Sequence, residues 1–374
     1  MPYPTRDICF EPARPEDEPE LRRVMRETAM DGTIRLAFAR EPSFYAAAAV
    51  EGPVHAAIVA RDPDGRVLGL CSRSTRTLWV DQAPVQVGYL SALRLEEAYR
   101  GRRQLLQRGF DAVRALAQAD PATTLHMTTI FEDNAPAIRF LSANLEGFPR
   151  YRRIGTVRTL ALPTWRRQRV PHGLALRAGT DDDLGEIAAL LHRELRRHLL
   201  APVWTEAELR DPARCRGLRP SDFTVAERDG RLVGCVALWD QTAYKQSIVV
   251  GYEGGLGTFR GLVNLAAPLL NVPRLPAPGE AIPHATLSHL AAEDDDELPL
   301  SLALVAHASN RAIGAGYSWL TFGVGDGDPL GDEVKRQYGA IEVRAALFLV
   351  SWPEGHAAAD AVAARVPRLE IATL

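Results

Sequence analysis

The order of strand and helix signals in this sequence occurs twice, on either side of an arginine-rich segment that ends in proline, residues 166–171 (RRQRVP). The first half begins with a strand signal at residues 7–12 and later has an Asp-Pro-Asp-Gly hairpin turn at 62–65. The second half begins with a strand signal at 174–178 and has a turn at 228–231 in the corresponding place. A repeated order of elements favours two similar α/β domains joined by a linker.

The length of the chain agrees with this division. Its 374 residues are many for one domain and sufficient for two that each bury a core. Hydrophobic residues make up 46% and charged residues 24%, the proportions of an ordinary globular protein. We therefore predict a first domain at residues 1–163, a linker at 164–173 and a second domain at 174–374.

Charge and cysteine usage exclude several classes of protein. A net charge of −3 argues against a dedicated nucleic-acid binder, which usually carries a strong basic excess. The cysteines are scattered and form no CxxC pair, so neither a zinc site nor a disulfide framework is expected; they are Cys9, Cys71, Cys215 and Cys235. No apolar run of about 18 residues occurs, and the first residues lack an apolar signal-peptide core. We expect a cytoplasmic protein with no membrane partner.

Hydrophobic periodicity predicts the individual elements. In the first half we expect strands at 7–12, 54–61, 66–80, 85–95, 124–131 and 148–162, and helices from 15–18 onward and at 42–50, 101–118 and 133–144. In the second half we expect strands at 174–178, 222–227, 232–238, 284–291, 317–322 and 341–351, and helices from 181–183 onward and at 204–214, 256–270, 299–315 and 329–338. A final helix and a final strand should follow.

A strand that runs into a helix through a basic turn is the most informative segment, VQVGYLSALRLEEAYRGRRQLLQRGFDAVRAL at 85–116. Helix N-termini expose unpaired backbone N–H groups and carry partial positive charge, so they bind phosphate well. Arg100, Arg102 and Arg103 add cations that suit phosphate oxygens. The turn alone equally fits an arginine-rich, solvated first helical turn without a ligand.

The same segment resembles motif A of the GNAT superfamily of N-acetyltransferases, in which a strand leads through an R-G-x-G-x-G/A turn into the coenzyme A helix. The matching positions are Leu93, Arg94 and Leu95 at the strand end, Tyr99, and Arg100, Gly101, Arg102, Arg103, Gln104 and Leu105 in the turn. Downstream, Asn134, Ala137 and Phe140 in FEDNAPAIRFL resemble the N-x-x-A helix of the family. The opening ICFEPARPED resembles its first strand and helix, so the resemblance spans most of residues 7–162.

The resemblance implies both a fold and a ligand. The implied fold class is α/β (α+β), with two tandem GNAT-like domains, each a mixed, mostly antiparallel sheet flanked by helices. The implied cosubstrate is acetyl-coenzyme A or another acyl-coenzyme A, without a metal. Its pantetheine arm would lie along Leu93, Arg94 and Leu95, and its pyrophosphate would lie in the turn from Arg100 to Leu105. Asn134 and Ala137 would pack beside it.

The sequence also departs from the family pattern. Arg103 and Leu105 stand where the family has its second and third turn glycines, which allow close backbone approach to phosphate. Leu141 stands where the family often has a tyrosine that acts as general acid. A changed or absent coenzyme site is therefore an alternative.

Acyl transfer to an amine requires a base, because the attacking amine must be neutral. Glu96 and Glu97 lie at the end of the central strand, where this family often places such a base. The alternative is two solvated glutamates before a turn. Tyr89 is a candidate for lining the acceptor site or donating a proton, or else a packing aromatic.

The second half has no turn of this kind. Its acidic run at 293–299 (EDDDELP) would repel a pyrophosphate, and no ligand spacing supports a metal site there. Gly323, Gly325 and Gly327 follow a strand, but the lysine and hydroxyl of a Walker motif are missing. We expect the second domain to keep the fold without a coenzyme site.

These observations lead to an acyl-coenzyme A-dependent N-acyltransferase whose acceptor is a small-molecule amine or a protein amine. The alternative is a binding or scaffold protein that has lost coenzyme A binding. Nucleic-acid binding through the arginines at 150–169 is disfavoured by the acidic net charge. Assembly into a homodimer stays open.

Overall fold

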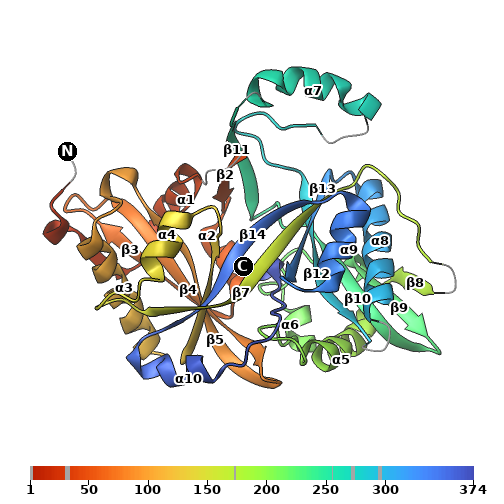
Figure 1. Ribbon diagram of the computed structural model, residues 1–374, viewed down its shortest axis with the longest axis horizontal. Coiled ribbons are helices and arrows are strands. Elements are labelled where there is room, and N and C mark those ends of the chain that lie inside the picture. The colour runs from red at the N-terminus through yellow and green to blue at the C-terminus, as the bar shows by residue number, and fades with distance from the viewer. Residues whose placement is uncertain (1–2, 30–33, 172–173, 255, 271–273, 294–296) are drawn as a thin grey trace.

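The computed structural model describes residues 3–29, 34–171, 174–254, 256–270, 274–293 and 297–374. Its main feature is one sheet of twelve strands that runs through the whole molecule (Figure 1). In spatial order the strands are β1 (Cys9–Pro12), β3 (Val54–Arg61), β4 (Val67–Val80), β5 (Ala83–Leu95), β6 (Leu125–Phe131), β14 (Ile341–Ser351), β7 (Arg150–Pro163), β13 (Trp319–Gly325), β12 (His284–Ala292), β10 (Arg231–Trp239), β9 (Phe223–Arg228) and β8 (Ala175–Ala178).

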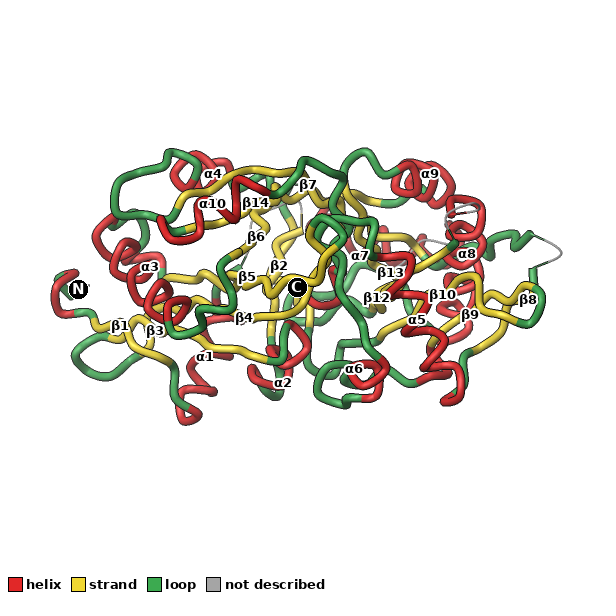
Figure 2. Tube along the Cα trace, turned by 90° about the horizontal axis from the view of Figure 1, so that it is seen from below, coloured by secondary structure: helices red, strands yellow, loops and turns green. Residues whose placement is uncertain are grey.

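Helices cover both faces of this sheet, as Figure 2 shows, with α4 and α10 on one side of the strands and α1 and α2 on the other. The helices are α1 (Glu18–Glu27), α2 (Phe44–Glu51), α3 (Arg103–Gln118), α4 (Ala135–Leu141), α5 (Leu184–Leu195), α6 (Glu206–Arg210), α7 (Leu256–Leu270), α8 (Glu297–Ala315), α9 (Pro329–Tyr338) and α10 (His356–Ala361). Within the described ranges, no helix is long and apolar enough to cross a lipid bilayer.

The sheet is mixed and mostly antiparallel. Only β5–β6 and β12–β13 pair in parallel, and all other described neighbours are antiparallel. The expected sheet type, flanked by helices, is therefore confirmed.

Local sequence explains two of the helices. α1 buries Leu21, Val24 and Met25 at i, i+3 and i+4, and the Ser43 hydroxyl caps α2 by accepting from the Ala46 amide at 3.1 Å.

The two halves of the chain exchange strands in the middle of the sheet. β14, from the second half, lies between β6 and β7 and pairs with both, for example Ala345 with Phe131 and Val157. β7, from the first half, pairs on its other side with β13. Each half thus contributes strands to the sheet of the other. The domain limits at residues 163 and 174 stay a prediction.

A shared apolar core also joins the halves. One buried cluster contains Ala47 and Trp79 from the first half together with Trp204 and Trp239 from the second. The predicted linker packs as well, since the Gln168 amide donates to Asn310 Oδ1 of α8 at 2.8 Å. Residues 172–173 of that linker lie outside the described residues.

Two strands that the sequence did not predict form a separate sheet. β2 (Ile34–Ala39) pairs with β11 (Gln246–Tyr252) in antiparallel register. β2 lies over the end of β6, because the rings of Phe38 and Phe131 stack nearly parallel with centroids 6.5 Å apart. α7 extends from β11 away from the main sheet (Figure 1).

Two sequence predictions are wrong. The helix expected at 204–214 ends at Arg210, because Asp211 precedes Pro212 and takes an extended backbone (ψ 114°). The expected final strand is not formed among the described residues. In its place Pro367 makes one isolated bridge to Leu199, and residues Ile371–Thr373 form a 3₁₀ turn.

Candidate active site

The parallel strands β5 and β6 part in the middle of the first half. Their pairing runs from Val87↔Leu125 to Tyr89↔Met127 and then stops, although both strands continue. Beyond that point the Thr128 hydroxyl donates to the Leu90 carbonyl at 2.7 Å. In the described ladder, the β5 edge from Leu90 onward therefore has no backbone partner on the β6 side, so it is open to pair with a ligand.

A β-bulge lies just beyond this point. The register between β4 and β5 shifts from Ser72↔Ser91 to Leu70↔Arg94, so β5 has one extra residue. Ala92 in the bulge has φ +52°, which is unfavourable for a residue other than glycine. Bulges and strained backbone are concentrated at functional sites, where they redirect side chains and N–H groups.

β5 leads into α3 through the predicted turn. Gly101 has φ +76°, and a side chain added there would meet no atom within 4 Å, so the turn leaves open space above this residue. The N-cap of α3 is Arg102, and no described side chain caps this helix end. Among the described residues, the amides of Arg103 and Gln104 have no hydrogen-bond partner and can bind an anion, whereas the Leu105 amide donates to the Arg102 carbonyl at 3.0 Å.

The predicted arginines of the turn make contacts within the protein. Arg102 donates to the carbonyls of Tyr3 (2.9 Å) and Ala98 (3.2 Å) and lies over the Tyr99 ring. Arg103 lies over the ring of Phe148, 5.7 Å from its centroid. These two guanidinium groups thus stabilise the turn as well as adding positive charge.

Arg100, Gly101, Arg103 and Gln104 are the exposed residues of the turn. Arg100 Nε donates to the Leu95 carbonyl at 3.1 Å, which holds this side chain against the strand end. Leu105, by contrast, is only 1% exposed and packs with Ile8 and Leu68. The leucine that replaces a family glycine is therefore a core residue that attaches α3 to the sheet.

The remaining predicted coenzyme residues lie around this turn. Leu93 is exposed and Arg94 and Leu95 are partly buried at the end of β5. Asn134 is the N-cap of α4, and its side-chain oxygen accepts from the Ala137 amide at 3.2 Å. This bond explains the N-x-x-A spacing as a helix cap, whatever ligand lies beside it.

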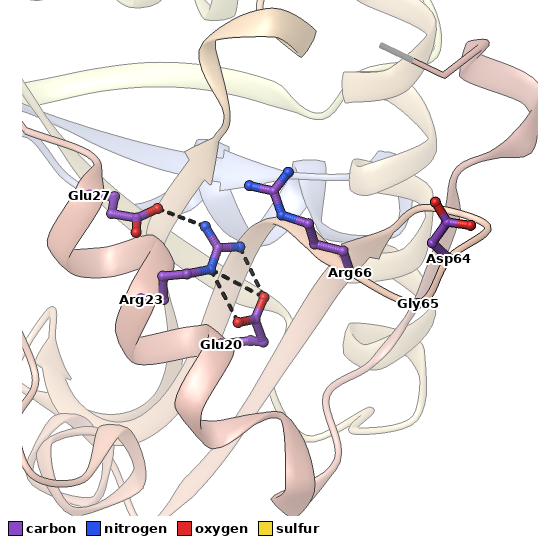
Figure 3. Close-up of a pocket in the computed structure, with 6 residues that line it drawn as sticks. All are labelled: Glu20, Arg23, Glu27, Asp64, Gly65 and Arg66. Atoms are coloured by element: carbon purple, nitrogen blue, oxygen red, sulfur yellow. Dashed lines mark hydrogen bonds and ion pairs between the residues drawn. The ribbon is translucent and has the colours of Figure 1, made fainter. Parts of the chain in front are cut away.

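The predicted bases lie at the surface. Glu96 is 2.6 Å from Arg66 Nη2 and 3.3 Å from Arg23 Nη1, and Glu97 is exposed. Arg23 and Arg66 line a surface hollow of about 470 Å³ with Glu20, Glu27, Asp64 and Gly65 (Figure 3). These two ion pairs at the surface favour a structural, ion-pairing role for Glu96.

A different carboxylate, not predicted from the sequence, lies beside the bulge. Glu51 ends α2 and is 6% exposed. Its Oε2 accepts from Ser74 at 3.2 Å and from Ser91 at 3.3 Å, and Ser74 also bonds His55 Nδ1 at 2.8 Å. The sequence held one signal for it, since an acid at the C-terminus of an otherwise apolar helix opposes the helix dipole.

Tyr89 lies at the last paired position of β5 and is 7% exposed. Its hydroxyl is 3.4 Å from Thr129 Oγ1. Burial raises the pKa of Tyr89 to about 12, so the phenol stays protonated at neutral pH. Tyr89 and Glu51 thus place a phenol and a carboxyl group near the point where β5 and β6 part. Leu141, which stands where the resemblance would place a general-acid tyrosine, packs in the core cluster with Phe110 and Phe348.

The second half contains a matching bulge that is filled. β12 and β13 pair in parallel only to Thr286↔Thr321, and His289 has φ +52°, the same backbone as Ala92. There the His289 amide donates to Glu370 Oε2 at 2.7 Å, and a side chain at Gly323 would lie 2.3 Å from Ile371.

The cavity left at this second bulge, next to Leu287 and Phe322, is about 20 Å³. Measured as the space open to the centre of a water molecule, this is room for about one water, which needs roughly 10–15 Å³. Residues 367–371 therefore occupy the place that remains open beside β5 in the first half.

Comparisons with known proteins bear on the fold. No protein-family profile matches the sequence, and no curated protein matches it. A GCN5-related N-acetyltransferase from Sphaerobacter thermophilus superposes with TM-score 0.56 at 13% identity, over 92% of this chain and 95% of that one. N-myristoyltransferase from Saccharomyces cerevisiae, solved with bound myristoyl-CoA, superposes with TM-score 0.58 at 14% identity, over 94% and 86%. The resemblance seen in motif A thus extends over the structure, and this chain has the GNAT-superfamily fold shared by GCN5-related N-acetyltransferases and N-myristoyltransferase.

Proposed function

We propose that the protein is an acyl-coenzyme A-dependent N-acyltransferase whose reaction takes place in the first half, with acetyl as the default acyl group. The observation that carries the proposal is the bulge at Ala92, which lies where β5 and β6 part and just before the uncapped N-terminus of α3. Two proteins of the same fold are an N-acetyltransferase and an N-myristoyltransferase with a bound acyl-coenzyme A.

The binding part of the proposal assigns the anionic end of the cosubstrate to α3. The first amides of α3 would bind the pyrophosphate, with Arg100 adding charge at the exposed side. The open β5 edge would pair with the amides of the pantetheine arm, as another strand would. Leu93 and Leu95 lie on that edge segment.

The chemical part assigns roles to Glu51 and Tyr89. The amine nitrogen of the acceptor bonds to the thioester carbon, and Glu51 takes the proton released from nitrogen, directly or through water. The carbon–sulfur bond then breaks, and the thiolate takes a proton from Tyr89 or from solvent. Backbone amides at the bulge stabilise the negative charge that develops on the thioester oxygen.

Calorimetric titration with acetyl-coenzyme A and with myristoyl-coenzyme A tests the proposal. We expect about one site per chain, with Arg100→Ala weakening binding about threefold to tenfold because a charge-assisted contact is lost. Arg114→Ala is the matched control, since Arg114 is a half-buried residue of the same helix that pairs with Glu354. The comparison of the two acyl chains also decides the preferred donor.

A second candidate is a scaffold protein without coenzyme A binding. The contacts of Arg102 and Arg103 within the protein favour it, because these guanidinium groups already have partners. Absence of binding to both acyl-coenzymes at about 1 mM, an affinity weaker than about −4 kcal/mol, would support the scaffold and reject the transferase.

A further inference from the structure

Arg40, at the end of β2, is a buried cation with incomplete neutralisation. Its side chain is 14% exposed, and its Nη2 lies 3.9 Å from Glu51 Oε1, a long contact for an ion pair. Its Nη1 donates to the Ala39 carbonyl at 3.3 Å. Burial lowers the pKa of Arg40, which means that its surroundings disfavour the charged form.

Arg94 is a second cation of this kind, on β5 directly after the bulge. Its Nη1 donates to the Leu93 carbonyl at 3.1 Å, and its buried Nε has no hydrogen-bond partner in the part of the chain that the structure describes. Burial lowers the pKa of Arg94, and the charge of Arg40 lowers it further. Glu51 connects the two arginines in space, because it lies 3.9 Å from Arg40 and accepts from Ser91, three residues before Arg94 on β5.

Arg94 belongs to the side of the sheet that α1 and α2 cover, and Arg40 approaches Glu51 of α2. Arg94 is paired with Leu70, whose side chain packs in a cluster with Phe44 of α2. Helix α3 covers the opposite face, where Phe110 packs in a cluster with Leu90. Figure 2 shows α2 and α4 on opposite sides of the strands. The excess positive charge thus lies on the face away from the coenzyme helix.

We propose that the acceptor amine carries a carboxylate, as an amino acid does, and that Arg40 and Arg94 bind this carboxylate while the amine lies at Glu51. The inference rests on the proposed acyl transfer. Guanidinium forks match a carboxylate in shape and charge, and an anion would offset the cost of two desolvated cations. Ser91, which donates to Glu51, lies three residues before Arg94 on β5. The amine of a small zwitterion could therefore lie at Glu51 while its carboxylate meets Arg94.

The test is binding of reaction products, which needs no turnover. N-acetylglycine, N-acetylphenylalanine and N-acetylglutamate are each compared with their α-carboxamides by calorimetry, with and without saturating coenzyme A. We expect at least one acid to bind about tenfold or more tightly than its amide, because the amide loses a hydrogen-bonded charge pair. Arg94→Gln should remove this preference, Arg94→Lys should retain part of it, and the control Arg114→Gln should leave it unchanged.

The outcomes separate this inference from the proposed function. Equal binding of acids and amides, or no binding of any acid at about 10 mM, a free energy weaker than about −3 kcal/mol, overturns the carboxylate site. If Arg94→Gln instead weakens acetyl-coenzyme A binding, the anion is a phosphate of the coenzyme and the inference is wrong. If the wild-type protein binds no acyl-coenzyme A, the transferase proposal fails, and the acid–amide comparison without coenzyme still tests the two arginines.

Discussion

Glu51 and Glu96 are competing candidates for the general base, and their surroundings distinguish them. Glu51 accepts from two serines beside the bulge, whereas Glu96 is paired with Arg23 and Arg66 at the surface. We expect Glu51→Gln to lower kcat by about 10²- to 10⁴-fold, the usual contribution of a positioned base, with little change in acetyl-coenzyme A affinity. Glu96→Gln should change kcat less than about threefold.

Initial rates of thiol release, measured with the most active primary amine of a screen, would check both variants. Raising the pH should reduce the defect of Glu51→Gln, because more of the amine is then already neutral. A large loss in Glu96→Gln with a normal Glu51→Gln would reverse the assignment and restore the base expected from the sequence.

The turn from Arg100 to Leu105 could be located from the sequence because its residues are contiguous and lead into one helix N-terminus. That this turn binds coenzyme A stays a prediction. Glu51 could not, since its partners Ser74 and Ser91 come from two other strands and meet it only in the folded sheet. The replacement of a turn glycine by Leu105 suggested a damaged phosphate site. In the fold, the Leu105 side chain fills the core under α3.

At the scale of elements, the segment 367–371 fills the second bulge and carries a buried acid. Glu370 accepts from the His289 amide, and burial raises its pKa to about 7. An acid with a raised pKa binds its proton more tightly in the folded state, so stability falls as the pH rises from about 4.5 to about 7 and is constant above that range.

Replacing Glu370 by glutamine should remove that loss, because the amide oxygen still accepts from His289 and carries no charge. Relative to wild type, Glu370→Gln should gain at most about 3 kcal/mol between pH 5 and pH 8. Unfolding by denaturant at both pH values measures this difference. An equal change in both proteins would show that Glu370 is not the titrating group.

Most elements matched the predicted ranges, because their periodicity is local. β2 and β11 escaped prediction since they pair with each other, Ala39 with Gln246, across a long stretch of sequence. The final strand was wrongly predicted for a similar reason. Ile371 lies against Gly323 and Pro367 lies against Gly325, and no alternation of apolar residues in the sequence reveals these contacts.

At the scale of the whole molecule, the strand exchange determines which pieces of the chain can fold. Residues 1–163 alone would leave β6 and β7 without β14, and both flanks of β7 would be unpaired. We expect this fragment and residues 174–374 each to be unfolded or insoluble when expressed alone, and to form a soluble complex when expressed together. Circular dichroism and size-exclusion chromatography would check this, and a cooperatively unfolding 1–163 fragment would contradict it.

The repeat of elements was visible in the sequence, but the exchange was not. Alternating apolar residues indicate that β7 and β14 are buried on their faces, and they do not specify which strands lie at their edges. Both Leu160 and Leu347 would be equally buried in two separate sheets or in one continuous sheet.

The position of β14 also has a consequence during synthesis on the ribosome. Phe131 of β6 pairs with Ala345, which emerges on the order of ten seconds or more later at ordinary elongation rates. Until then the nascent first half exposes an open strand edge beside the proposed reaction centre, where chaperones would be expected to bind. The half that is translated first therefore cannot complete its sheet until almost the whole chain has been synthesised.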